Sequence, residues 1–327
     1  MTQTVKKLVL LVNLGSPETL SVGAIRNFLR QFLSDQRVVG LPKLLWYPIL
    51  YGIILPLRSK KLLHKYQQIW LENDCAPLIH YTKEQARLLQ EHLRTTDDTA
   101  RVGYAFCYGA EDIKAQLVKY SAEQAISELV VVPLYPQYSS STTAAVFDQI
   151  SHYYQKSYSV PKIKFINSFA DHSLYIQALA NQVREHWASN GRGDRLVVSF
   201  HSLPVKLVEN GDSYVEECKL TYQLLCQALE LEPEVEAKLC FQSKFGRAEW
   251  VGPATDATLN VLAMAEIATV DVICPGFVSD CLETLEEIAI QNRELYISRG
   301  GRELRYIPCL NASSELTIVL NKIIQEG

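Results

Sequence analysis

One segment of the chain reads Arg195-Leu196-Val197-Val198-Ser199-Phe200-His201-Ser202-Leu203-Pro204. Its short apolar run, rich in β-branched residues, predicts a buried strand over 195–201 that ends in an imidazole and a turn. In open parallel sheets, ligands bind at the carboxyl ends of the strands. His201 is therefore a candidate base or metal ligand, although a strand-end histidine that only hydrogen-bonds a neighbouring loop fits this segment equally well.

Similar apolar runs alternate with amphipathic helical patterns along the whole chain. The expected strands cover 8–13, 101–107, 128–134, 162–166, 195–201, 237–242, 269–274 and 303–307. The clearest helical patterns between them cover 22–34, 82–94, 110–121, 173–189, 213–230, 255–266, 280–296 and 313–325. Such alternation of strands and helices predicts parallel sheets covered by helices.

The length of 327 residues is about that of two domains. We therefore expect an α/β fold of two lobes with a cleft between them. The predicted lobes cover residues 1–163 and 164–327, with the boundary close to Ser159-Val160-Pro161. Packing of the last helix back onto the first lobe is an open alternative.

Composition and motifs exclude several classes of protein. The formal net charge of -4 disfavours a nucleic-acid-binding protein, which would normally be basic. Neither G-x-G-x-x-G nor G-x-x-x-x-G-K-[ST] is present, so a nucleotide cofactor is disfavoured. The 8 cysteines form no C-x-x-C pair, and reduced thiols in a cytoplasmic protein are the simplest interpretation. The apolar run 8–12 is short for a signal peptide, and no run is as long as a membrane span.

Residues 44–57 form the most hydrophobic stretch, and Arg58, Lys60 and Lys61 follow it directly. As a single helix it would reach about 21 Å, short of the roughly 30 Å hydrocarbon core of a membrane. The prolines within it are expected to break even that helix. A buried core helix, a lip over a large apolar ligand and a membrane-surface contact all remain open. The basic neighbours favour the lip, because an amphiphile with carboxylates would suit both.

A second cluster of interest is acidic. Ser279 or Asp280 is expected to cap a helix on which Glu283 and Glu287 share one face. The helix dipole favours carboxylates in a first turn, so a solvated acidic face explains the pattern. The alternative is an oxygen-lined track for a hard or borderline cation with a base at its inner end. For Cys281 a half-buried structural thiol is favoured over a soft metal ligand.

Taken together, several segments resemble ferrochelatase, the enzyme that inserts ferrous iron into a porphyrin at the end of haem synthesis. The resemblance covers nearly the whole chain. The segments that carry it are Asn13-Leu14-Gly15-Ser16-Pro17-Glu18, Pro133-Leu134-Tyr135-Pro136-Gln137-Tyr138-Ser139-Ser140-Ser141-Thr142-Thr143, Ser199-Phe200-His201-Ser202-Leu203-Pro204, Phe241-Gln242-Ser243-Lys244-Phe245-Gly246, Trp250-Val251-Gly252-Pro253-Ala254-Thr255-Asp256 and Ser279-Asp280-Cys281-Leu282-Glu283-Thr284-Leu285.

The resemblance implies two Rossmann-like, chelatase-type lobes with a porphyrin cleft between them. It implies that His201 and Glu283 are both catalytic residues and metal ligands, with Glu287 on an outer metal path. The next position of that acidic ladder is Gln291 here, which breaks the full carboxylate track. Some members carry a histidine at the position of Cys281, so this thiol is not required for the chemistry.

The resemblance also implies contacts with the porphyrin. Arg58 matches a basic residue that contacts a propionate, and Tyr138 and Ser139 lie in a matching motif. The apolar lip at about 40–60 adds Trp46 and Tyr47 as predicted substrate-binding residues.

The predicted reaction is insertion of Fe²⁺ into protoporphyrin IX to form protohaem. It combines distortion of the macrocycle, removal of pyrrole protons and metal transfer at His201 and Glu283. No cofactor is expected, iron is a substrate, and no C-terminal iron–sulfur cluster is expected because no cysteine follows Cys309. The expected location is cytoplasmic, with an open possibility of peripheral contact with the inner membrane.

Two alternatives remain. One keeps the fold and changes the substrate, giving a chelatase for coproporphyrin or for cobalt or nickel. The other is a tetrapyrrole-binding protein without catalysis. An inert binding protein would have no need for His201 and Glu283 to face each other.

Overall fold

The computed structural model describes residues 7–95, 97, 99–123, 125–244, 246 and 248–326. The chain forms two compact units: the first contains Met1–Tyr135, Ser139–Asn167 and Ala312–Gly327, and the second contains Pro136–Tyr138 and Ser168–Asn311. The last helix, α12 (Ser314–Glu326), belongs to the first unit and packs against α4 (Pro77–Leu93). The chain therefore passes between the two units several times, whereas the sequence predicted a single boundary.

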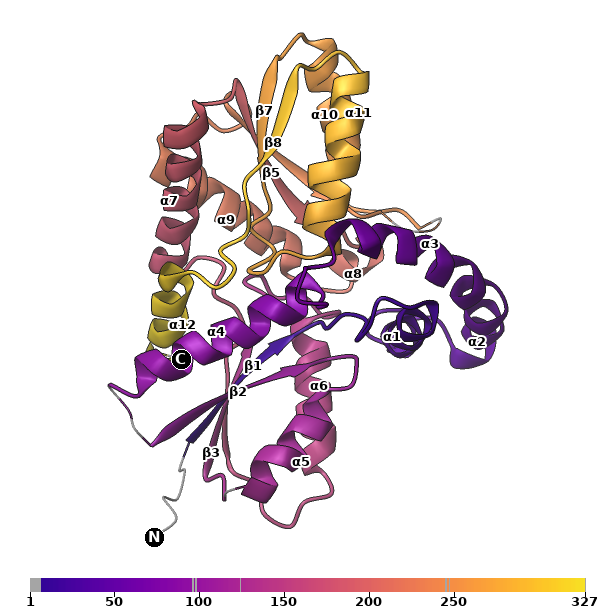
Figure 1. The fold of residues 1–327 in the computed structure, drawn as a ribbon, viewed down its shortest axis with the longest axis vertical. Helices are drawn as coiled ribbons and strands as arrows, with labels where there is room; N and C mark the ends of the chain where they lie inside the picture. Colours follow the sequence, from indigo (N-terminus) through magenta and orange to yellow (C-terminus); the bar gives the residue numbers. More distant parts are fainter. Residues whose placement is uncertain are drawn as a thin grey trace. The chain divides into compact units, whose positions relative to one another are not determined.

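The first unit contains a parallel sheet of four strands in the order β2-β1-β3-β4 (Figure 1). Its strands are β1 (Lys7–Asn13), β2 (Ala100–Phe106), β3 (Glu128–Pro133) and β4 (Lys162–Phe165). The central strands β1 and β3 are runs of leucine and valine that are almost wholly buried, as helices on both faces require. The other helices around this sheet are α1 (Val22–Ser34), α5 (Ile113–Glu123) and α6 (Thr143–Tyr154).

The second unit repeats this topology, with strand order β6-β5-β7-β8 and all pairs parallel. Its strands are β5 (Arg195–His201), β6 (Ala237–Gln242), β7 (Thr269–Ile273) and β8 (Glu303–Tyr306). Figure 1 shows α7 (Ser173–Asn190) and α9 (Tyr214–Leu229) on one side of this sheet and α10 (Thr255–Met264) and α11 (Arg293–Ser298) on the other. The short α8 (Val205–Glu209) follows β5. After β5, the chain adds β6 on one side of that strand and then β7 and β8 on the other side. The topological switch point therefore lies between β5 and β7.

The predicted break of the apolar stretch at its prolines is wrong. Residues 43–69 are helical throughout, as α2 (Lys43–Ile49), a π-helical segment η1 (Leu50–Ile54) and α3 (Leu55–Ile69). Pro48 lies inside α2, where it removes the backbone donor to the carbonyl of Leu44, and the π-helical segment η1 begins two residues later. Pro56 lies in the first turn of α3, where its missing N–H has no intrahelical partner to lose.

The acidic helix also differs from its prediction. Instead of one α-helix over 280–296, the chain forms the π-helix η2 (Leu282–Asn292), which continues into α11. Neither Ser279 nor Asp280 caps it: Cys281 is the N-cap residue, in a reciprocal capping box with Thr284. π-Helices are rare and are frequently found at functional sites.

Asp280 has a structural task instead. Its side chain is buried and accepts hydrogen bonds from the hydroxyl of Tyr306 at 2.6 Å, the hydroxyl of Thr284 at 3.0 Å and the amide of Asn311 at 2.6 Å. These bonds join the turn before η2 to the segment after β8. The start of η2 is therefore fixed to the sheet by a fully paired carboxylate.

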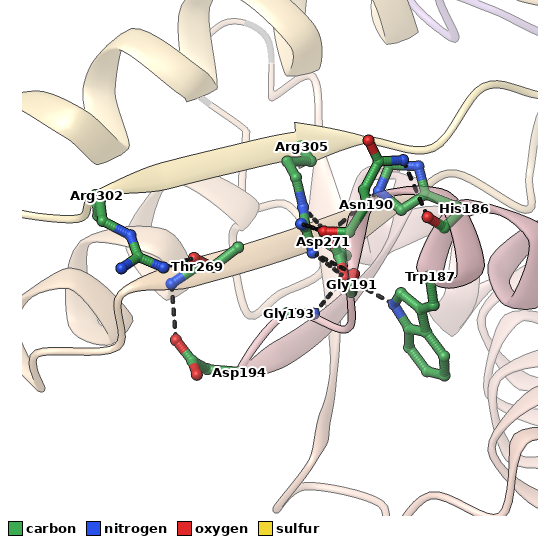
Figure 2. A network of polar contacts seen from close by, with 10 residues as sticks. All are labelled: His186, Trp187, Asn190, Gly191, Gly193, Asp194, Thr269, Asp271, Arg302 and Arg305. Atoms are coloured by element: carbon green, nitrogen blue, oxygen red, sulfur yellow. Dashed lines mark hydrogen bonds and ion pairs between the residues drawn. The ribbon is translucent and has the colours of Figure 1, made fainter.

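A second buried carboxylate lies on β7 (Figure 2). Asp271 has 1% of its side chain exposed and accepts from Arg305 Nε at 2.7 Å and Nη2 at 3.0 Å. It also accepts from Trp187 Nε1 at 2.7 Å and from the main-chain N–H of Gly193 at 2.9 Å. A Cβ on Gly193 would lie 2.7 Å from the carboxylate, so this position must be glycine for the approach to occur. The cluster lies where the chain enters β5 and therefore serves packing of the sheet.

Candidate active site

The candidate site lies at the carboxyl edge of the second sheet, where β5 and β6 end and η2 begins. His201 is the last residue of β5 and is paired in register with Gln242, the last residue of β6. Phe277, in the turn after β7, brings its ring to 6.5 Å from the imidazole ring, measured between centroids. Parallel strand ends next to a topological switch point are where α/β proteins bind ligands.

The hydrogen bond of His201 determines which ring nitrogen is free. Nδ1 lies 2.5 Å from the main-chain oxygen of Ser202. Because a carbonyl oxygen only accepts, Nδ1 carries the proton, and in the neutral imidazole Nε2 keeps its lone pair. The half-buried ring thus presents one nitrogen that can accept a proton or bind a metal.

The main chain of His201 is held as well. It hydrogen-bonds the hydroxyl of Tyr214, at the start of α9, and burial raises the pKa of that hydroxyl well above its ordinary value. Tyr214 therefore remains a neutral phenol at physiological pH. It supports the strand end and supplies no base.

Glu283 and Glu287 both lie on η2 and are half-buried. The main-chain oxygen of Glu283 accepts a hydrogen bond from Gln242 Nε2 at 2.7 Å. The carboxylate of Glu287 accepts one bond per oxygen from Ser243, from the main-chain N–H at 2.7 Å and from the hydroxyl at 2.5 Å. Ser243 adopts a left-handed conformation, with φ of 66°, which a non-glycine residue rarely takes. The residue that follows β6 is thus bonded to the side chain of Glu287 on η2.

The electrostatics connect these groups. Burial raises the pKa of Glu287 above its ordinary value; the bonds from Ser243 and the nearby charge of His201 oppose this rise, and the charge of Glu283 adds to it. Glu287 therefore lies close enough to His201 and Glu283 for their charges to affect its pKa. Proton transfer benefits from such coupling, because a carboxyl with a raised pKa exchanges protons nearer to neutral pH.

This shift makes a prediction for stability. When the pKa of a glutamate is higher in the folded state than in the unfolded state, ionising it destabilises the fold. This loss of stability is absent below the unfolded pKa of about 4.3, and it grows until the pH reaches the folded pKa. The free energy of unfolding of Glu287→Gln minus that of the wild type should therefore increase from pH 4 towards neutral pH and then level off. Urea titrations over this pH series measure it. A difference that is constant with pH would contradict the raised pKa.

Among the residues that the structure describes, no group of three or more histidine, cysteine, aspartate or glutamate side chains could hold a metal ion. Cys281 is buried, more deeply than expected, and burial raises the pKa of its thiol well above the ordinary value. It is a neutral capping residue in the structure.

The predicted porphyrin contacts in the first unit differ in exposure. Trp46 is buried, and its Nε1 donates to the main-chain oxygen of Leu33 at 2.6 Å, so this ring anchors α2 to α1. Tyr47 is half-buried and packs edge-to-face on Tyr51, with centroids 5.7 Å apart. Arg58 on α3 is half-buried, and this burial lowers the pKa of its guanidinium.

The remaining two candidates lie in the segment between β3 and α6. The main-chain N–H of Tyr138 donates to Glu217 at 2.8 Å, while its ring is half-buried. Ser139 is buried, and its hydroxyl lies 3.0 Å from that of Ser141. Phe245, in one of the quoted motifs, lies outside the described residues.

Sequence reasoning assigned no role to three residues that shape this site: Gln242, Ser243 and Tyr214. Gln242 and Ser243 follow the apolar run that became β6. Applying the strand-end rule to β6 as well as to β5 would have found them.

The chain is similar to known proteins along nearly its whole length. A profile of the ferrochelatase family matches residues 6–327. A ferrochelatase from Proteus mirabilis is 45% identical over 318 residues, covering 97% of each chain. One from Aromatoleum aromaticum is 45% identical over 318 residues, covering 97% of this chain and 86% of the relative. One from Escherichia coli is 43% identical over 307 residues, covering 94% of each.

Solved structures support the fold. SirB from Bacillus subtilis with Fe³⁺ matches with a TM-score of 0.59 at 10% identity, covering 98% of this chain and 95% of SirB. The sirohydrochlorin chelatase SirB from Bacillus subtilis subspecies spizizenii, in complex with cobalt, matches with a TM-score of 0.57 at 10% identity, covering 98% and 94%. The predicted class, two parallel sheets flanked by helices in a chelatase-type fold, is confirmed. The chain belongs to the ferrochelatase family of metal chelatases.

Proposed function

We propose that the chain inserts ferrous iron into protoporphyrin IX, forming protohaem and releasing the two pyrrole protons, with His201 and Glu283 at the reacting centre. Family membership implies porphyrin and iron as substrates. The observation that best supports the proposed residues is the grouping of His201, Glu283 and Glu287 at the carboxyl edge of the second sheet.

His201 is the proposed first proton acceptor. Its Nδ1–H is engaged by Ser202, so Nε2 is the nitrogen that can take a pyrrole proton or transiently bind iron. Glu283 then receives metal or passes protons outward. Glu287 is the outer residue on this path, and its raised pKa suits it to bind a proton transiently.

Weak metal binding is required for this chemistry, because the ion must leave the protein for the porphyrin. An imidazole and a carboxylate are both competent ligands for Fe²⁺, but two protein ligands hold the ion only loosely. Strain in the bound macrocycle, supplied by contacts away from the metal, would expose the pyrrole nitrogens to the ion. No resident cofactor and no iron–sulfur cluster form part of this proposal.

For the porphyrin, we propose a propionate contact at Arg58 and ring contacts at Tyr47, Tyr138 and Ser139. Burial lowers the pKa of Arg58, and a partly desolvated guanidinium forms strong hydrogen bonds with a carboxylate such as a propionate. Trp46 acts indirectly, since its buried ring holds α2 in place.

The first test is an insertion assay with two porphyrins. Wild-type protein should convert protoporphyrin IX with Fe²⁺ under anaerobic conditions, and with Zn²⁺ in air, followed by the Soret shift. Turnover of coproporphyrin should be slower, because its additional propionates meet the apolar surface of α2 and η1. Faster turnover of coproporphyrin, or faster turnover with cobalt or nickel, would support the alternative chelatase. Binding without turnover would support a tetrapyrrole-binding protein.

The exposed side of α2 and η1 suggests a peripheral membrane contact at the cytoplasmic face of the inner membrane. Leu44 is 89% exposed and Leu45 is 64% exposed, and the exposed cations Lys60 and Lys61 follow on α3. In the described part of the chain, no helix is long and apolar enough to cross a membrane. An apolar surface beside basic residues is the pattern of interfacial binding.

Leu44→Gln with Leu45→Gln should therefore weaken binding to vesicles of phosphatidylethanolamine and phosphatidylglycerol by at least about 10-fold, since burying a leucine is worth about 1.5–3 kcal/mol. Vesicle co-sedimentation measures it. The matched control is Val261→Gln on α10, whose side chain is 62% exposed. Equal binding by the double variant and the control would leave this surface without a membrane role.

A further inference from the structure

Gln242 is a buried amide at the edge of the site that the proposed chemistry does not use. It is 2% exposed, and each end of its side chain is engaged. Oε1 accepts from the hydroxyl of Ser199 on β5 at 2.7 Å and from the thiol of Cys274, just after β7, at 3.5 Å. Nε2 donates to the main-chain oxygen of Glu283 on η2 at 2.7 Å. One side chain thus connects the ends of three strands to the first turn of the π-helix.

The chemistry of these partners determines the orientation of the amide. A main-chain oxygen can only accept, so the NH₂ group must face Glu283, and the carbonyl of the amide must face Ser199 and Cys274. Because the amide is planar, a donor at Oε1 also sets the side on which Nε2 points, and either Ser199 or Cys274 is enough for this. The carbonyl of Glu283 is consequently held at a position that the sheet determines.

The consequence for the site follows from register. His201 and Gln242 are adjacent across β5 and β6, and the main-chain N–H of Ser202 donates to the main-chain oxygen of Gln242 at 2.8 Å. The side chain of Gln242 reaches from this pair to the residue that carries the Glu283 carboxylate. It therefore gives a hydrogen-bonded connection between the two proposed catalytic residues.

We propose that Gln242 is a positioning residue for metal insertion: it holds the turn of η2 that carries Glu283 at a set distance from His201. The inference rests on the proposed function of these two residues. It predicts that loss of the amide donor affects turnover and leaves porphyrin binding intact. A misplacement of about 1 Å can cost about 10²-fold in rate.

The test is Gln242→Met, which keeps the length of the side chain and removes its hydrogen bonds. The turnover number kcat for Zn²⁺ and Fe²⁺ insertion should fall by about 10²-fold. The Kd for protoporphyrin, measured by fluorescence quenching, should stay at the wild-type value. If Gln242→Met does not fold, Gln242→Asn takes its place, because it keeps an amide in the core but draws the donor away from Glu283.

Ser199→Ala is the matched control. It removes a partner of Oε1, while Cys274 and the Nε2 bond to Glu283 remain. If Gln242 is a positioning residue, this variant should keep a near-normal kcat, even if its thermal stability is lower. Three results would overturn the inference: wild-type kcat in folded Gln242→Met, a loss that appears in porphyrin Kd alone, or an equal loss of kcat in Ser199→Ala. None of these three results would contradict the proposed function, because the wild-type assay and the His201 variants test that function separately.

Discussion

Replacing His201 with alanine is expected to lower the rate of metal insertion by about 10²–10⁴-fold, the range of a lost general base, while porphyrin still binds. The side chain provides the only Nε2 lone pair at the end of β5, and the Nδ1 bond to Ser202 keeps that lone pair directed away from the main chain. The nearby Tyr214 cannot replace this base, because it is a phenol with a strongly raised pKa. The measurement is the anaerobic Soret shift with Fe²⁺, beside protoporphyrin quenching for Kd.

Two additions make this experiment decisive. Exogenous imidazole should restore part of the lost rate, because the proposed role needs a nitrogen base and no further contact. His152→Ala, which removes an exposed histidine of α6, should behave as the wild type. Near-normal turnover by folded His201→Ala would remove His201 from the reaction and leave the carboxylates of η2 as the proton acceptors to test.

The central strands β1, β3, β5 and β7 were predictable because each is a short, buried run rich in valine, isoleucine or leucine. The predicted 195–201 and 237–242 agree with β5 and β6, and His201 lies at the strand end as expected. This pattern arises wherever a parallel strand is covered on both faces, so local sequence is sufficient to find it.

The helices that carry the site were less predictable. A π-helix has no distinct residue pattern, so η2 was expected to be an α-helix. Pro48 indicated a break, yet the chain remains helical through it and into η1. In both cases tertiary packing overrides local preference.

Contacts between distant residues were the least predictable. Glu287 and Ser243 are 44 residues apart, and nothing in either segment indicates that both oxygens of the carboxylate are taken by one serine. Trp46 was predicted to contact the ligand from its place in an apolar stretch, and nothing in that stretch indicates that its buried ring donates to the main chain of Leu33. Asp271 had a readable signal, a lone acid in the buried run Thr-Val-Asp-Val-Ile, which requires a partner.

The Asp271 cluster gives the largest expected effect on stability. Asp271→Ala should lower the free energy of unfolding by about 3–5 kcal/mol, because it strips a buried ion pair of one partner. Arg305, with 14% of its side chain exposed, would keep only its bonds to the main-chain oxygens of Asn190 and Gly191. The N–H groups of Trp187 and Gly193 would also lose their acceptor. Urea denaturation, followed by far-ultraviolet circular dichroism, measures the change.

The chain contains its own control for burial. Asp148 receives a two-pronged bond from Arg37, with Nε–Oδ2 at 2.7 Å and Nη2–Oδ1 at 3.1 Å, but these side chains are 50% and 41% exposed. Asp148→Ala should therefore cost less than about 1 kcal/mol, as solvent-exposed pairs do. Equal losses at Asp148 and Asp271 would show that pairing geometry, and not burial, sets the energy. The double variant Asp271→Leu with Arg305→Met removes both charges of the buried pair. It should recover much of the free energy of unfolding that Asp271→Ala loses, because that loss arises from the uncompensated charge of Arg305.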